Sequence, residues 1–128
     1  MKFLLDTSIV SLVARKSKAA TKRYERHLDD CALPSIVWHE LHCGIQRMKA
    51  GAIKSQFLAF YETLLQPVLP YDKAAAAYHA EERARLKSCP SADAQIAAIA
   101  VTQELILVTA NVRDFKSFRG IRLEDWSR

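Results

Sequence analysis

The chain of 128 residues contains few glycines, prolines and cysteines, with 3, 4 and 3 of these residues. The low glycine and proline content excludes a collagen-like, linker-like or low-complexity chain. The cysteines are widely spaced and form no Cys-x-x-Cys pair, so a disulfide framework is not expected. We therefore expect reduced, unpaired thiols and a cytoplasmic protein.

Long hydrophobic runs are also missing. The longest candidate, residues 3–14, is interrupted by Asp6 and is too short to span a membrane. Only Lys2 precedes this run as a basic segment, which argues against a signal peptide. Hydrophobic residues make up 50% of the chain and charged residues 26%, a balance typical of a soluble globular protein. The length predicts a single domain over residues 1–128.

Basic residues outnumber acidic ones, 19 to 14, which gives a formal net charge of +5. This charge is compatible with nucleic acid, an anionic membrane or an acidic protein as a partner. It is equally compatible with a surface charge that only keeps the protein soluble. The basic helix expected over residues 15–26 has the same two interpretations, a phosphate-contacting surface or a solvated face.

Short apolar runs alternate with helical patterns along the chain. The expected strands are 2–5, 31–34, 67–70, 105–108 and 121–123. Three of the expected helices begin after Asp6, Asp72 and Ser91, and three more cover residues 15–26, 36–49 and about 57–65. Gly51 is expected to end the helix over 36–49, and residues 111–120 are expected to form a polar loop. This alternation predicts a three-layer α/β/α domain with a short, mostly parallel central sheet.

Polar side chains follow two of these strands. Asp6 comes directly after the first strand, and Thr109 and Asn111 follow strand 105–108, with Asp114 three residues further on. The carboxyl ends of parallel strands meet at one edge of a sheet, where ligands bind. Asp6 alone could be a helix cap, and Asp114 alone could be an ordinary loop acid.

Two further acids lie on expected helices. Glu40 borders the buried stripe marked by Val37, and Asp93 lies in the first turn of the helix that begins at Ser91, where it could simply favour the helix dipole. If these two acids converge with Asp6 and Asp114, they repel one another unless a cation lies among them. Carboxylates of this kind suit Mg²⁺, which supports phosphodiester hydrolysis.

These residues resemble the PIN-domain ribonucleases, and among them the VapC-like toxins of bacterial toxin–antitoxin pairs. The matching segments, in order, are residues 4–8 (LLDTS), 37–41 (VWHEL), 92–98 (ADAQIAA), 108–115 (VTANVRDF) and 123–126 (LEDW). The resemblance covers essentially the whole chain. It departs at Ala110, where many relatives carry Arg, and this difference affects the expected grip on substrate.

The resemblance implies an acidic quartet that binds Mg²⁺ or Mn²⁺, and a metal-activated water that cleaves RNA. By position the quartet is Asp6, Glu40, Asp93 and Asp114, supported by Thr109, Asn111 and a hydroxyl from Thr7 or Ser8. The resemblance further implies structured RNA such as tRNA or rRNA as substrate. It also implies a homodimer, and a VapB-like antitoxin that occupies the acidic crevice. Arg113 and Lys116 flank this crevice and are our candidates for phosphate contact.

Several alternatives stay open. The chain could be a PIN nuclease in RNA processing, or a non-catalytic module that binds RNA or protein. A receiver domain is disfavoured because Asp6 lacks a paired acid after the first strand. His39 and His42 invite a zinc interpretation, but they are three residues apart, whereas the zinc-protease pattern requires four. The aromatic residues Phe57, Phe60 and Tyr61 are expected to belong to the core or to an interface.

Overall fold

A five-stranded parallel sheet forms the centre of the molecule in the computed structural model, which describes residues 1–64 and 66–128. Its strands are β1 (Phe3–Leu5), β2 (Cys31–Pro34), β3 (Val68–Leu69), β4 (Ile106–Val108) and β5 (Leu123–Glu124). They lie in the order β3-β2-β1-β4-β5, so β1 pairs with both β2 and β4. This arrangement brings the residue after β1 beside the residues after β4.

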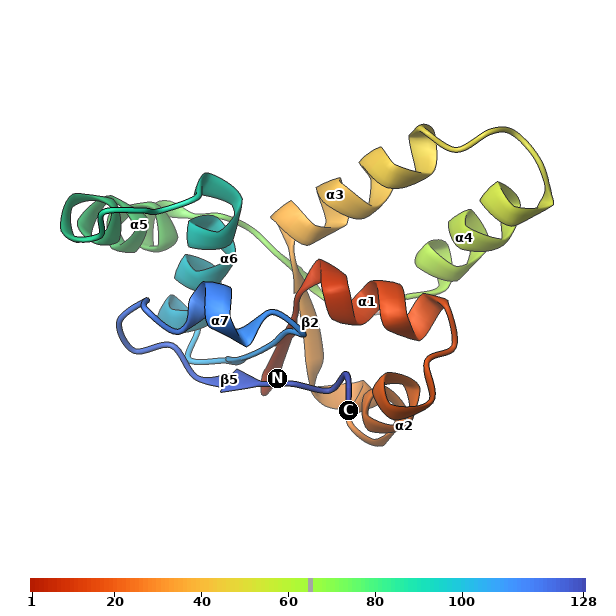
Figure 1. Cartoon of the computed structure of the whole chain (residues 1–128), viewed down its shortest axis with the longest axis horizontal. Coiled ribbons are helices and arrows are strands. Elements are labelled where there is room, and N and C mark those ends of the chain that lie inside the picture. The colour runs from red at the N-terminus through yellow and green to blue at the C-terminus, as the bar shows by residue number, and fades with distance from the viewer. Residues whose placement is uncertain (65) are drawn as a thin grey trace.

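The helices form two groups on opposite sides of the sheet (Figure 1). On one side lie α1 (Thr7–Ala14), α2 (Lys18–Arg26), α3 (Ser35–Gln46) and α4 (Ala52–Thr63). On the other lie α5 (Lys73–Arg85), α6 (Ser91–Thr102) and α7 (Val112–Phe115). The predicted α/β/α architecture with a parallel sheet is therefore confirmed. Within residues 1–64 and 66–128, no helix has the length and apolar character that a membrane crossing requires.

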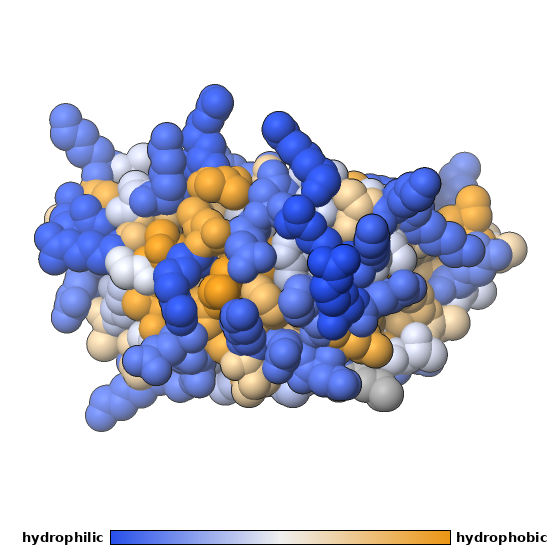
Figure 2. Space-filling view, turned by 90° about the horizontal axis from the view of Figure 1, so that it is seen from below, coloured by the Kyte–Doolittle hydropathy of each residue, from blue (hydrophilic) through white to orange (hydrophobic). Residues whose placement is uncertain are grey.

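The core lies where the central strands meet the helices. Leu4 of β1 and Leu107 of β4 are fully buried, as expected for strands covered on both faces. Trp126 closes one end of the core. Its ring centre lies 5.0 Å from that of Phe3 in an edge-to-face arrangement and 5.5 Å from that of His27 in a stacked one. Hydrophilic side chains cover most of the face in Figure 2, with a smaller hydrophobic area among them.

Several predicted boundaries were wrong. The third helix ends at Gln46, and Gly51 precedes α4 instead of terminating α3. The basic helix begins at Lys18, not at residue 15. The polar loop 111–120 contains the short helix α7, because the buried ring of Phe115 fixes that segment against the core. Leu65, which we placed in the helix of Phe57, lies outside the described residues.

Candidate active site

Asp6 is the most buried acid of the candidate site, with 7% of its surface exposed. It takes the N-cap position of α1, but its side chain caps no backbone amide of that helix. Instead, Asp6 Oδ2 accepts hydrogen bonds from Thr109 Oγ1 at 2.8 Å and Ser8 Oγ at 3.1 Å. The Asp6 amide also donates to the Val108 carbonyl at 2.9 Å. The cap interpretation of this side chain was therefore wrong.

The hydroxyl groups around Asp6 join the two strand ends. Ser8 Oγ accepts from the Ala110 amide at 3.1 Å, and Thr109 Oγ1 accepts from the Asn111 amide at 2.9 Å. Thr109 is fully buried, whereas the Asn111 side chain is exposed. Asp6 therefore has a fixed position, because hydrogen bonds from both strand ends restrict its rotation.

Glu40 and Asp93 share the electrostatic neighbourhood of Asp6, and Asp114 lies near Asp93. Burial raises the pKa of Glu40, and the negative charges of Asp6 and Asp93 raise this pKa further. Burial also raises the pKa of Asp93, again with contributions from Asp6 and Asp114. The fold therefore brings together the acids that we selected at the strand ends and on the two helices. Their negative charges oppose one another in the absence of a cation.

These acids would need water molecules to complete the coordination of a metal ion. Across residues 1–64 and 66–128, no three His, Cys, Asp or Glu side chains come close enough to hold an ion by themselves. Thr7 Oγ1 is buried beside Glu40 and lowers its pKa, yet it has no hydrogen-bond partner at normal distance within the described chain. An orphaned hydroxyl among repelling carboxylates fits a hydrated hard cation, which keeps several of its waters.

Two cavities adjoin the acids. One, of about 340 Å³, reaches Thr7 and Glu40 at one end and the aromatic rings of Phe57 and Tyr61 at the other. The second, of about 410 Å³, is lined by residues 110–114 together with Asp125 and Arg128. The candidate site therefore opens on both sides, toward α4 and toward the C-terminal segment.

A family comparison decides the class of this fold. The PIN domain family matches residues 3–121. The chain belongs to the PIN-domain family. A tRNA(fMet)-specific endonuclease VapC from Shigella flexneri is 31% identical over 99% of both chains. Ribonuclease VapC2 from Haemophilus influenzae is 29% identical over 98% of both. The crystal structure of DNA-bound VapBC from Salmonella typhimurium matches with a TM-score of 0.86 and 30% identity, covering 98% of each chain.

The remaining candidate residues of this PIN domain take different places. Arg113 lines the second cavity, whereas Lys116 lies exposed at the C-cap of α7. Asp125 and Arg128 line the same cavity but were not selected as site residues, although Asp125 lies in the matching segment LEDW. The Asp125 carboxylate accepts from the Ser127 amide at 2.8 Å, which shapes the turn before Arg128. The buried Trp126 between them was a signal that this tail is fixed against the domain.

The two histidines of α3 do not face the same way. His42 Nδ1 lies 2.8 Å from the Trp38 carbonyl, and its ring packs against the Trp38 ring at 4.5 Å. His39 is exposed and lies beside Cys43. The aromatic residues expected in the core or at an interface pack on the core, where Tyr61 is buried and Phe57 and Phe60 are partly buried. Phe57 and Tyr61 also line the first cavity.

Proposed function

We propose that this chain is a metal-dependent endoribonuclease that acts as the toxin of a toxin–antitoxin pair. Membership of the PIN-domain family and the relatives named VapC support this function. The observation that carries it is the buried Asp6, held by Ser8 and Thr109 beside Glu40 and Asp93, whose negative charges oppose its own. We infer that residues 1–128 work as one PIN-domain unit.

The acids Asp6, Glu40, Asp93 and Asp114 would hold Mg²⁺ or Mn²⁺, directly or through water. A cation bound there supplies a more acidic water as nucleophile and neutralises charge on the phosphate oxygens. Thr109 and Ser8 keep the Asp6 carboxylate oriented, because both donate hydrogen bonds to it. Asn111 is exposed beside this group and is positioned to bind substrate or water. Thr7 supplies a further hydroxyl at the same place.

The proposed substrate is structured RNA, either tRNA or rRNA. The Shigella relative, named as a tRNA(fMet)-specific endonuclease, supports this choice. Arg113 and Lys116 would contact phosphates next to the cleaved bond, and Arg128 lines the same cavity as Arg113. The net charge of +5 favours association with the RNA backbone.

The proposed protein partners are a VapB-like antitoxin and a second copy of this chain. The VapBC complex from Salmonella typhimurium supports an antitoxin partner. The cavity between Glu40 and the rings of Phe57 and Tyr61 offers both an acidic and an apolar contact. An antitoxin segment with a basic residue next to apolar ones would complement these contacts and cover the acidic crevice.

The test is cleavage of total cellular RNA by the purified, antitoxin-free protein in Mn²⁺, Mg²⁺ or chelator. Asp93→Asn keeps the side-chain volume but removes the charge, and Glu25→Gln removes an exposed charge on α2 as the matched control. We expect discrete fragments from the wild type and from Glu25→Gln in either metal, and none from Asp93→Asn or in chelator. Sequencing the fragment ends identifies the RNA.

Two outcomes would contradict the proposal. Cleavage that continues in chelator, or in Asp93→Asn, would show that the reaction does not need metal-bound acids. Intact RNA under every condition, from protein shown to be folded by circular dichroism, would favour a non-catalytic RNA- or protein-binding module. Cleavage confined to precursor RNAs, with no effect on mature tRNA or rRNA, would favour a role in RNA processing.

A further inference from the structure

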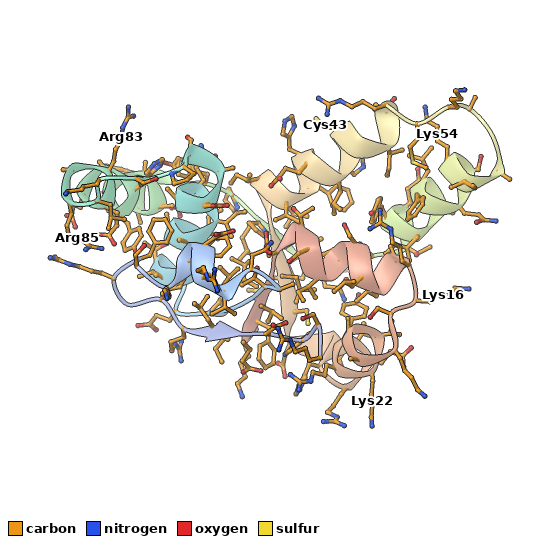
Figure 3. The ribbon with its side chains drawn as sticks, viewed as in Figure 1. Lys16, Lys22, Cys43, Lys54, Arg83 and Arg85 are labelled. Carbon is orange, nitrogen blue, oxygen red and sulfur yellow. The ribbon has the colours of Figure 1, made fainter. Side chains whose placement is uncertain are left out.

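His39 and Cys43 form a pair of metal-ligating side chains that the proposed nuclease does not use. They lie one helical turn apart on α3, and Cys43 Sγ lies 3.5 Å from His39 Nε2 and 3.9 Å from Nδ1. His39 is exposed and Cys43 is half-buried, and Figure 3 shows Cys43 toward the C-terminal part of α3. Both side chains are therefore open to ions in solution.

The spacing of these two atoms matches a chelate. A tetrahedral zinc ion binds thiolate sulfur at about 2.3 Å and imidazole nitrogen at about 2.0–2.1 Å, which places the two ligand atoms about 3.5–3.6 Å apart. The observed separation of 3.5 Å between Sγ and Nε2 matches this spacing, but Nδ1 lies at 3.9 Å, so the exposed imidazole has to turn until its Nε2 lone pair faces the ion. The helix supplies the spacing, because residues four apart lie on the same face.

We propose that His39 and Cys43 form a binding site for a thiolate-preferring divalent cation such as Zn²⁺. Thiolate and imidazole select zinc over Mg²⁺, whereas the carboxylates around Asp6 select hard cations. His42 does not join the pair, because its ring packs on Trp38. No third His, Cys, Asp or Glu is close enough to complete a group of three anywhere in residues 1–64 and 66–128, so water completes the coordination and the affinity is modest.

The site has a consequence for its neighbour on α3. Glu40 follows His39 in the chain, and the charge of His39 already lowers the pKa of that carboxyl. An ion on the pair adds positive charge at the same place. It therefore repels a second cation at the acids, without sharing a ligand with them.

The test uses Co²⁺ and Zn²⁺ alone as probes of the purified full chain. A thiolate ligand gives Co²⁺ a near-ultraviolet charge-transfer band, which oxygen ligands do not give, so this pair is distinguished from the acids. We expect the band in the wild type, its displacement by Zn²⁺, and its strengthening as pH rises, because the thiol releases its proton on binding. Cys43→Ser abolishes the band, and His39→Gln weakens Co²⁺ binding by about tenfold or more.

Two matched variants serve as controls. Cys89→Ser removes the other half-buried thiol, and Asp93→Asn removes a carboxylate of the proposed nuclease site; both should keep the band. A band that survives in Cys43→Ser, or that is lost in Cys89→Ser, would overturn the assignment. So would a wild type without any band at millimolar Co²⁺. None of these results depends on RNA cleavage, so the pair and the nuclease can fail separately.

Discussion

Replacing Glu82 by Gln should lower stability at neutral pH and remove part of the acid sensitivity of the fold. The Glu82 side chain is only 3% exposed, and Arg85 binds it with both Nε (2.9 Å to Oε2) and Nη2 (2.7 Å to Oε1). The Arg119 amide donates to Oε1 at 2.7 Å. Arg85 also reaches the Ser117 carbonyl at 2.8 Å, so the group connects α5 to the loop after α7. Figure 3 shows Arg85 and Arg83 on different sides of α5.

The magnitude follows from the pKa of Glu82. Hydrogen bonds from Arg85, opposed by burial and reinforced by the Arg119 amide, lower the pKa of this carboxyl from 4.5 to about 2. At about 1.4 kcal/mol per pKa unit, this shift corresponds to at most about 3.5 kcal/mol of stability. Arg85 is itself 31% exposed, so solvent screens the pair and we expect about 1–3 kcal/mol.

The pH window follows from the direction of this shift. A lowered carboxyl pKa stabilises the folded state fully above about pH 4.5, and the contribution is lost as pH falls toward 2. Urea unfolding followed by circular dichroism at several pH values from 7 to 3 measures this loss. We expect Glu82→Gln to be less stable than the wild type at pH 7, and the difference to shrink below about pH 4.5.

The exposed neighbour Glu81 provides the matched control, because Glu81→Gln removes a charge from the same helix without touching the buried pair. Other acids titrate equally in all three proteins and cancel in the comparison. A stability difference between wild type and Glu82→Gln that stays constant from pH 7 to pH 3 would refute the reasoning. An equal loss in Glu81→Gln would refute it as well.

Three further predictions concern the site and the core. Asp93→Asn should raise the melting temperature in chelator, because the raised pKa of Asp93 means that its charge opposes folding at neutral pH. Calorimetry measures this change, and a lower melting temperature would contradict the prediction. Thr109→Val should reduce RNA cleavage or apparent Mn²⁺ affinity by about 10–100-fold, because Asp6 loses its 2.8 Å hydrogen bond. Unchanged cleavage kinetics would argue against this role of Thr109. Trp126→Ala should cost about 3–5 kcal/mol in urea unfolding, because this ring is 1% exposed, and a loss below about 1 kcal/mol would show that the tail is dispensable.

The sheet could be predicted from the sequence because all of its strands except β5 are uninterrupted apolar runs. Residues 105–108 have this pattern, and β4 occupies Ile106–Val108 with pairing to β1. Helix ends were harder to predict. Gly51 suggested the end of α3, but that helix stops five residues earlier, at Gln46. Helix termini depend on packing with neighbouring elements as well as on local breakers, so a glycine marks the connection but not the boundary itself.

The candidate site could be predicted only as a set of positions. Asp6 and Thr109 were selected because each follows a strand, and the fold brings these ends together. Their hydrogen bond joins residues 103 positions apart, and no local pattern specifies it. Glu82 was missed, although it lies on the same helical face as the buried Ala75. Its partner Arg119 comes from a distant loop, so the sequence could indicate burial but not what satisfies the charge.

The acids of the site are held in place by two different means, and this explains how the fold tolerates their repulsion. Asp6 is fixed by the hydrogen bonds that it accepts from Ser8 and Thr109. Asp93 is fixed by its helix instead, because the residues that follow it in α6 are buried almost without interruption from Ala94 to Ala100. Moving Asp93 away from Asp6 would require α6 to leave the core. Packing energy therefore holds this carboxylate in its repelling position, where a bound cation would relieve the repulsion without any movement of the backbone.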